Sequence, residues 1–351
     1  MAKNDRHYAI AIGIDTYPSL RRLTASVRDA TAFCEWLLSA DGGNLPEQNL
    51  KFIPSLPKMP GDRFDARPIR LEIDRALRDF GVEQNRRLGD RLYFYFAGHG
   101  FGPSFDNVGM LMANAAMGAL TENIGLRPFR DYFYETKRFD EVVFLLDCCR
   151  DREFKDDTMP PGFDKKLVAQ DGKPVVDFVV MASSYGEKAF APVERETNER
   201  RGLLTKALLE GLRGAPRAVD AEGRITATSL SQYLKERVPA LAKIEKLVQD
   251  AECPPPTAEI VFRTLDPATL KRVRVHIVVP AEVGGEFVLR DGGRREVGRR
   301  NAEQARADNP WTEDLLVNSR YELEHVDSDI AVIIDPAKAK EEPYVFTFPR
   351  P

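Results

Sequence analysis

The chain contains few cysteines and no long run of apolar residues. Four cysteines in 351 residues are too few for a disulfide framework, so we expect a reducing compartment. No stretch approaches the length of a membrane span, and the N-terminal sequence MAKNDRHYAIAIGIDTY lacks the apolar length of a signal peptide. These absences predict a soluble, cytoplasmic protein that makes no membrane contact.

The chain also has no excess of one charge. Its 51 Lys and Arg residues are balanced by 55 Asp and Glu, and the net charge of -4 comes without any long basic run. This balance argues against a nucleic-acid partner. The sequence holds only four His residues and no pair of cysteines at zinc-ligand spacing, so we expect no metal site.

Apolar strand-like runs alternate with amphipathic helical segments through the first three quarters of the chain. Residues 7–14 form the first such run, and residues 24–38 carry apolar side chains at helical spacing. This alternation predicts an α/β domain over 1–264 with a mostly parallel central sheet. Shorter alternating runs separated by turns follow, and they predict a small all-β, sandwich-like accessory domain over 265–351.

Two of the buried runs stop abruptly at reactive side chains. His99 stands near the end of the run YFYFAGHG, and Cys149 stands near the end of the run VVFLLDCCR. If the two strands are parallel neighbours, both side chains emerge at the same sheet edge, where a base can activate a thiol. The backbone amides of Gly100 and Cys149 would then form an oxyanion hole. The alternative for each motif taken singly is structural: a surface histidine in a turn, and two buried core thiols.

The ordered set of motifs resembles the caspase-like fold of metacaspases and bacterial orthocaspases. It comprises YAIAIGIDTY, LTASVRDATAF, YFYFAGHG, FLLDCCR, MASSYGEKAFAP, RRGLLTKALLEGLRG and EGRITATSLSQYL, over roughly residues 7–263. The resemblance implies a three-layer peptidase fold in which His99 is the base, Cys149 the nucleophile and Cys148 an inert neighbour. Arg150 and the next two residues stand where the family often has His-Ser-Gly, which weakens inferences about substrate contacts there.

The resemblance also implies a preference for basic side chains before the scissile bond. In metacaspases the acid two residues before the nucleophile, here Asp147, lines the primary pocket with an acid of the first helix, which corresponds to Asp29. Two partly desolvated carboxylates attract Lys or Arg strongly. The alternative is that Asp29 merely caps or solvates its helix. Ala97 replaces a serine common in the family, so Lys-versus-Arg preference stays open.

No cofactor is expected, and calcium stimulation is not favoured. Many metacaspases respond to calcium through clustered acids, and Asp151, Asp156 and Asp157 are candidates. They lie in a segment with Pro, Gly and nearby Lys rather than in an ordered ligand spacing, so a solvated acidic loop is the preferred interpretation.

Two polar segments are candidates for proteolytic processing. The first contains Lys165 and Lys166, and the second ends in Arg200 and Arg201. Cleavage by the enzyme itself or by an activating protease fits such exposed segments, while ordinary solvated loops are the alternative.

The prediction is therefore a caspase-like cysteine endopeptidase that cleaves protein substrates after Arg or Lys. Its accessory domain would bind a regulatory partner or restrain the protease. Two alternatives remain at this point: a non-catalytic interaction module on the same fold, and a different thiol-dependent hydrolase.

Overall fold

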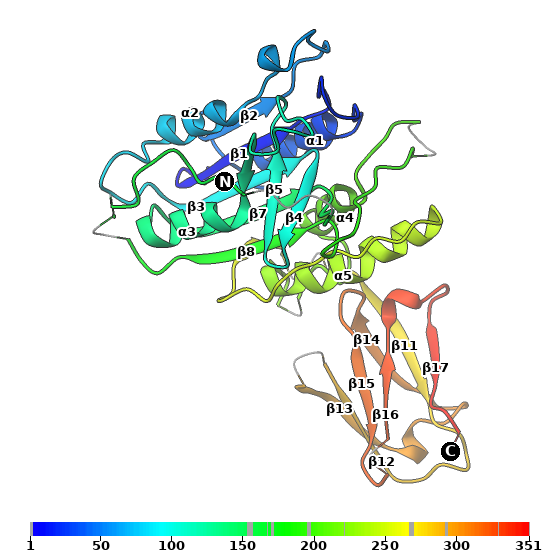
Figure 1. Ribbon diagram of the computed structural model, residues 1–351. Helices are drawn as coiled ribbons and strands as arrows, with labels where there is room; N and C mark the ends of the chain where they lie inside the picture. The colour runs from blue at the N-terminus through cyan, green and yellow to red at the C-terminus, as the bar shows by residue number, and fades with distance from the viewer. Residues whose placement is uncertain are drawn as a thin grey trace. The chain divides into compact units, whose positions relative to one another are not determined.

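The chain forms two compact units. The computed structural model describes residues 3–152, 157–166, 168–169, 172–194, 198–220, 222–266, 270–291, 294–328 and 330–350 (Figure 1). One unit comprises residues 1–213 and 233–260, and the other comprises residues 214–232 and 261–351. Within the part of the chain described, no helix combines the length and the apolar character that crossing a bilayer requires.

A five-stranded parallel sheet is the centre of the first unit. Its strand order is β2-β1-β3-β7-β8, and every neighbouring pair is parallel. The strands are β1 (His7–Gly13), β2 (Leu50–Pro54), β3 (Gly89–Ala97), β7 (Phe139–Asp147) and β8 (Val176–Met181). The predicted α/β fold with a mostly parallel central sheet is confirmed.

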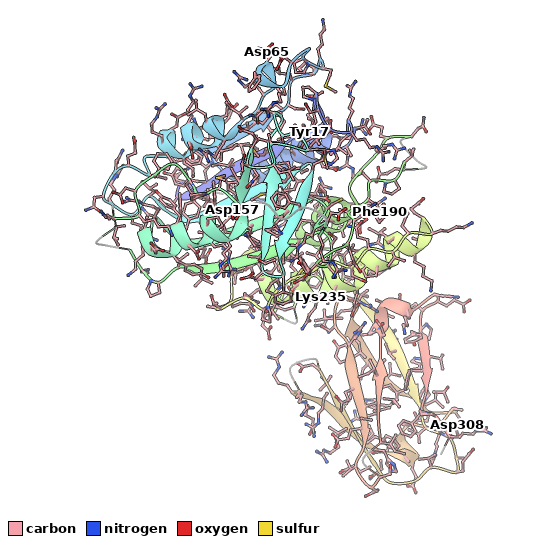
Figure 2. The ribbon with its side chains drawn as sticks, viewed as in Figure 1. Tyr17, Asp65, Asp157, Phe190, Lys235 and Asp308 are labelled. Atoms are coloured by element: carbon pink, nitrogen blue, oxygen red, sulfur yellow. The ribbon has the colours of Figure 1, made fainter. Side chains whose placement is uncertain are left out.

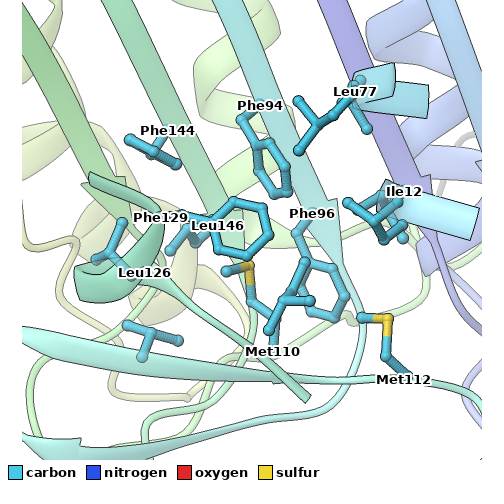
Figure 3. Close-up of a cluster of buried hydrophobic side chains, with 14 of the residues drawn as sticks. Ile12, Leu77, Phe94, Phe96, Met110, Met112, Leu126, Phe129, Phe144 and Leu146 are labelled. Carbon is cyan, nitrogen blue, oxygen red and sulfur yellow. The ribbon is translucent and has the colours of Figure 1, made fainter. Parts of the chain in front are cut away.

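Helices cover both faces of this sheet because successive strand residues point to opposite faces. Helices α2 (Arg70–Phe80) and α3 (Leu126–Thr136) cover one face, where the Phe94 and Phe129 rings lie 5.5 Å apart (Figure 3). On the other face, α1 (Ser26–Leu38) and α4 (Leu203–Leu212) pack, and the Phe33 ring stacks on Tyr95 at 4.8 Å. The arrangement has the three layers expected.

Short elements complete this unit. Strands β4 (Gly100–Ser104), β5 (Asn107–Leu111) and β6 (Asn123–Gly125) form a small antiparallel sheet that the sequence patterns do not predict. Two 3-10 turns, η1 (Glu47–Asn49) and η2 (Arg63–Asp65), lie in the connections. Strand β4 starts one residue after His99, so this sheet fixes where the chain goes once it has passed the histidine.

The second unit is mostly β. Its two larger sheets share one apolar core that includes Ile277, Phe287, Trp311 and Leu323. One sheet has the order β14-β11-β17 and the other β13-β12-β15-β16. Their strands are β11 (Arg272–Val278), β12 (Glu286–Arg290), β13 (Glu296–Asn301), β14 (Trp311–Leu316), β15 (Tyr321–His325), β16 (Ile330–Ile334) and β17 (Tyr344–Thr347), with 3-10 turns η4 (Ala302–Gln304) and η5 (Pro336–Lys338). The additional all-β region is confirmed.

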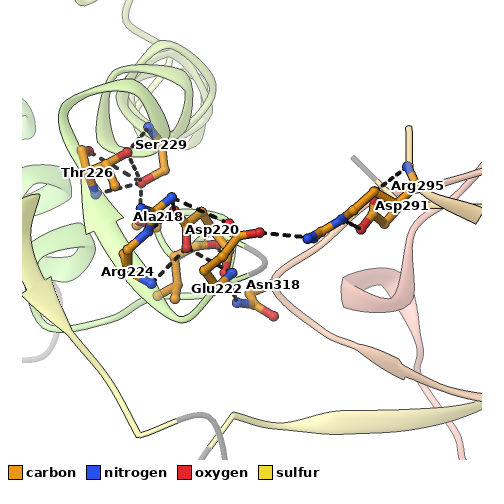
Figure 4. Close-up of polar contacts among 10 residues, drawn as sticks. Ala218, Asp220, Glu222, Arg224, Thr226, Ser229, Asp291, Arg295 and Asn318 are labelled. Atoms are coloured by element: carbon orange, nitrogen blue, oxygen red, sulfur yellow. Dashed lines mark hydrogen bonds and ion pairs between the residues drawn. The ribbon is translucent and has the colours of Figure 1, made fainter. Parts of the chain in front are cut away.

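Residues 214–232 belong to the second unit. Asn318 Nδ2 donates to the carbonyls of Val219 and Asp220 at 3.3 and 3.2 Å, and Arg295 pairs with Glu222 at 2.9 Å (Figure 4). Strand β9 (Arg224–Thr226) pairs with β10 (Val261–Thr264), and helix α5 (Ala227–Ile244) starts in this unit. The two compact units therefore divide the chain differently from the domain boundary between residues 264 and 265, which the change in sequence pattern predicts. That boundary stays a prediction.

Candidate active site

Strands β3 and β7 bring the predicted base and nucleophile to one edge of the sheet. The two strands are parallel neighbours, and Ala97 at the end of β3 is paired with Asp147 at the end of β7. His99 and Cys149 each follow two residues later. Both line one cavity of about 600 Å³ beyond the carboxyl ends of the strands, where α/β proteins place their ligands.

A tyrosine and a backbone carbonyl orient His99. The His99 amide donates to the Tyr17 hydroxyl at 3.0 Å, and the two rings lie 4.7 Å apart (Tyr17 is labelled in Figure 2). Nε2 lies 2.6 Å from the carbonyl oxygen of Arg21. Since a carbonyl only accepts, Nε2 carries the proton, and in the neutral ring Nδ1 is free to act as a base. Burial lowers the pKa of His99, which favours this neutral form.

Gly98 allows the tyrosine to approach this closely. A Cβ at position 98 would lie 2.6 Å from the Tyr17 hydroxyl and 2.8 Å from the Phe96 ring. Tyr17 is fully buried and also donates to the carbonyl of Leu111 at 3.2 Å. The sequence does not reveal this role of Tyr17, because nothing about a tyrosine just after a strand indicates a contact with a residue 82 positions away.

The two adjacent cysteines occupy different environments. Cys148 is buried in the core, whereas Cys149 is half-buried and lines the cavity. The sulfur of Cys149 accepts from the Ala189 amide at 3.3 Å and lies 3.7 Å from the Ala189 carbonyl. Burial raises the pKa of the Cys149 thiol, the Ala189 amide opposes this, and the resting group is therefore a thiol that needs a base to react.

Both predicted pocket carboxylates line the same cavity as the two reactive residues. Asp29, in the first turn of α1, is 2% exposed, and Asp147 is 8% exposed. Asp29 Oδ2 accepts from the Gly202 amide at 2.8 Å. Asp147 Oδ2 accepts from the Thr205 amide and hydroxyl at 3.0 and 2.6 Å. The alternative for Asp29, a solvated helix cap, does not agree with this burial.

One carboxyl oxygen in this pocket lacks a partner. Asp29 Oδ1 is buried and accepts no hydrogen bond among the described residues. Burial raises the pKa of Asp29 well above its usual value, and the neighbouring Asp147 raises it further. Burial likewise raises the pKa of Asp147, against the Thr205 hydrogen bonds. A cation entering the pocket would relieve both effects, so the arrangement suits a guanidinium or ammonium group.

Arg150 holds the nucleophile's loop, a role that the sequence does not reveal. Its side chain is 0% exposed and bonds Glu252, the Ser183 carbonyl at 3.3 Å and the Phe105 carbonyl. Its amide donates to the Glu187 carbonyl at 3.0 Å, and its carbonyl accepts from the Gly186 amide at 2.8 Å. The turn so fixed leads to Ala189, which contacts the Cys149 sulfur.

The remaining predicted residues lie around this centre. Gly100 is buried in β4, where a Cβ would lie 2.6 Å from the Cys148 sulfur, and it is not among the cavity-lining residues; its oxyanion role stays a prediction. Lys165 pairs with Glu135 at 2.8 Å, and Lys166 is exposed. Arg200 is exposed and lines the cavity, and Arg201 is half-buried.

The acids considered for calcium do not form a site among the described residues. No group of three or more His, Cys, Asp or Glu side chains with metal-binding geometry occurs in the ranges that the structure covers. Asp151 and Asp157 are described, whereas Asp156 lies outside the described residues. The role of calcium therefore stays a prediction.

Known proteins resemble this chain in sequence and in structure. A family model described as the caspase domain matches residues 6–253. A probable protease from a Desulfuromonadales bacterium is 32% identical over 255 residues, which is 66% of this chain and 30% of that protein's length. The crystal structure of caspase-1 from Spodoptera frugiperda, 15% identical, covers 75% of this chain and 92% of its own, with a TM-score of 0.45. A Geobacter sulfurreducens protein, 13% identical, covers 75% of this chain and 96% of its own, with a TM-score of 0.39.

Proposed function

The chain belongs to the caspase domain family, and from this premise we propose that it is a cysteine endopeptidase that cleaves proteins after arginine or lysine. The observation that carries the proposal is one cavity lined by His99, Cys149 and two buried carboxylates, Asp29 and Asp147. The first two residues provide the chemistry for cleavage, and the last two select the substrate. The probable protease that resembles this chain supports the same class of reaction.

In the first half of the reaction, His99 Nδ1 takes the proton of the Cys149 thiol as its sulfur attacks the scissile carbonyl carbon. The carbonyl oxygen becomes an oxyanion, stabilised by the amides of Cys149 and Gly100. The tetrahedral intermediate then collapses, the C–N bond breaks, and His99 gives its proton to the leaving amine. The product is a thioester between Cys149 and the N-terminal part of the substrate.

In the second half, a water molecule replaces the leaving amine. His99 takes a proton from the water as its oxygen attacks the thioester carbonyl, and the released thiolate of Cys149 recovers that proton. The Arg21 carbonyl accepts from Nε2 of the ring, so it stabilises the imidazolium that forms in each half of the reaction. Tyr17 keeps the ring in place throughout.

The substrate's basic side chain would enter between Asp29 and Asp147. Oδ1 of Asp29 is a buried acceptor without a partner among the described residues, so it supplies an unused hydrogen-bonding position for a guanidinium or ammonium N–H. An ionised Asp side chain in the same pocket would lose its hydration beside two acidic groups, which is strongly unfavourable at reduced dielectric.

A panel of fluorogenic peptides that differ only in the residue before the scissile bond tests this proposal. We expect turnover after Arg and Lys, and none after Asp or Gln. Cys149→Ala and His99→Ala should each abolish turnover, because the two residues act as a unit. Cys148→Ala is the matched control and should keep much of the activity. Cleavage after Asp, or activity in Cys149→Ala, would overturn the proposal.

We further propose that activity follows cleavage of a loop, after Lys165 or Lys166 or after Arg200. A cut after Arg201 is disfavoured, since it would turn the Gly202 amide, 2.8 Å from Asp29 Oδ2, into a charged amine that fills the pocket. Intact-mass measurement on active wild type and on Cys149→Ala identifies the cut. Fragments found only in the wild type would mean self-cleavage, and a fully active uncut chain would contradict the requirement.

The β-rich C-terminal region has no catalytic signature. We propose that it serves as a docking site for an activating or regulatory partner of a cytoplasmic enzyme. A C-terminally truncated chain with altered activity on peptides would support a regulatory role.

A further inference from the structure

The mouth of the active-site cavity carries positive charge, in contrast to its acidic pocket. Arg21, Arg22, Lys188 and Arg200 all line the cavity, and all four are exposed. Among the described lining residues, the only carboxylates are the buried Asp29 and Asp147. We call these four residues the cationic rim.

The rim has no carboxylate partner among the residues that the structure describes. Across the portion of the chain that the structure describes, none of its four side chains forms an ion pair; Arg200 donates to the Ala191 carbonyl at 2.9 Å. The next residue along, Arg201, is the cation whose charge acts on Asp29. The rim therefore does not serve to neutralise the pocket carboxylates, and its charge is available to a ligand.

Arg21 lies beside the proposed base, and Arg22 follows it in the lining of the same cavity. The Arg21 carbonyl accepts from His99 Nε2, and the Arg21 charge lowers the pKa of His99. Lys188, in contrast, acts on Cys149, where its charge lowers the thiol pKa. Because His99 delivers its proton to the leaving amine, the residues after the scissile bond pass close to Arg21.

We propose that the enzyme selects substrates in which the basic residue is followed by Asp or Glu, whose carboxylate binds Arg21 and Arg22. This inference rests on the proposed peptidase function and adds a second element of specificity to it. Two guanidinium groups that line one cavity can provide a bidentate partner for one carboxylate or separate partners for two. The substrate motif is therefore a cation followed within two residues by an anion.

Matched peptides test this proposal. One series has Arg before the scissile bond and Asp, Glu, Ser or Lys at the first and second positions after it. The quantity compared is the ratio of kcat/KM for the acidic peptide to that for the Ser peptide, within each variant. We expect a ratio of about three to five in wild type at low salt, as for exposed ion pairs, and a smaller ratio at high salt.

Three variants locate the effect. Arg21→Gln/Arg22→Gln should bring the ratio close to one. Lys58→Gln/Arg78→Gln makes the same change in net charge at exposed sites outside the cavity and should keep the wild-type ratio. Lys188→Gln should keep it as well, because Lys188 lies on the nucleophile's side. A wild-type ratio near one, or its loss in either control variant, would overturn the assignment.

Binding measurements separate this inference from the proposed function. Fluorescence anisotropy with Cys149→Ala reports peptide affinity without any turnover. Tighter binding of acidic peptides that is lost in Cys149→Ala/Arg21→Gln/Arg22→Gln supports carboxylate binding by Arg21 and Arg22. If wild type nevertheless cleaves none of these peptides, only the peptidase proposal fails. Cleavage after Arg without a preference for acidic peptides in rate or in binding contradicts carboxylate binding by Arg21 and Arg22, and it leaves the peptidase proposal intact.

Discussion

Gly202→Ala is the substitution that tests the pocket geometry most directly. Gly202 precedes α4 with φ -60° and ψ 132°, a conformation that alanine adopts without strain, so the backbone tolerates the change. An added Cβ would overlap Asp147 Oδ2 and lie 3.0 Å from both Asp147 Cγ and Asp29 Oδ2. The substitution therefore places one methyl group between the two carboxyls and alters little else.

The size of the effect of Gly202→Ala follows from the atoms that the added methyl group displaces. To restore an ordinary van der Waals separation, the Asp147 carboxyl must retreat by about an ångström or more. This strains its hydrogen bonds to the Thr205 amide and hydroxyl. Overpacking at such a site costs about 1–3 kcal/mol of folding stability. A similar loss in the interaction with a bound cation lowers kcat/KM for Arg peptides by about ten- to a hundredfold.

The assay compares kcat/KM for Arg and Lys peptides with the alkylation rate of Cys149 by iodoacetamide. We expect the peptide rates to fall while alkylation stays within about twofold of wild type, since burial and the Ala189 amide, which affect the Cys149 pKa most, are left unchanged. Gly61→Ala is the control, because a Cβ there meets nothing within 4 Å. If Gly202→Ala keeps kcat/KM within a factor of about three, the two carboxyls do not form the binding pocket and the reasoning is wrong.

Three further predictions concern protonation, loop support and metal. The pKa values of Asp29 and Asp147 are raised in the free pocket, and a bound cation favours their ionised forms. KM for Arg peptides should therefore fall as the pH rises through the raised pKa values of these carboxyls, while KM for the uncharged citrulline peptides should not change. If KM for both kinds of peptide changes with pH in the same way, this prediction is wrong. Arg150→Lys should lower kcat while changing KM little, because lysine cannot replace all the hydrogen bonds of the buried guanidinium. Arg150→Met/Glu252→Met removes both charges of the pair and should restore folding stability, measured as Tm, without restoring kcat. Activity should persist in excess chelator, and complete loss that calcium reverses would show a metal requirement.

The sequence predicts the parts of the site that follow long strands. β3 and β7 are nine-residue, largely buried strands, and their apolar runs end where the structure ends them. Parallel pairing then fixes which residues emerge together, so His99 and Cys149 can be predicted as neighbours before any coordinates exist. The buried position of Asp29 is different, because only the family resemblance suggested it.

The residues that orient the catalytic groups leave no such pattern. Tyr17 contacts His99 across 82 positions of sequence, and Arg150 reaches Glu252 across 102. Each is a single polar side chain in a loop or at a strand end, where periodicity carries no information. The sequence of strand β4 likewise does not predict a strand, because Gly100–Ser104 contains two glycines and a proline, which are uncommon in strands.

The pocket's burial explains how two acids can select a base without destabilising the empty enzyme. Asp29 and Asp147 lie close enough that the Gly202 Cβ position is within 3.0 Å of both side chains. If both were ionised in the empty pocket, their repulsion would oppose folding; burial raises both pKa values and the charge of Asp147 raises that of Asp29 further, so the doubly ionised state is disfavoured until a cation is bound. A basic side chain favours the ionised forms of both carboxyls and binds to the charges that it stabilises. A neutral side chain of the same length brings no charge to offset the cost of ionising two buried carboxyls. Selectivity for charge therefore increases with the burial of the acids.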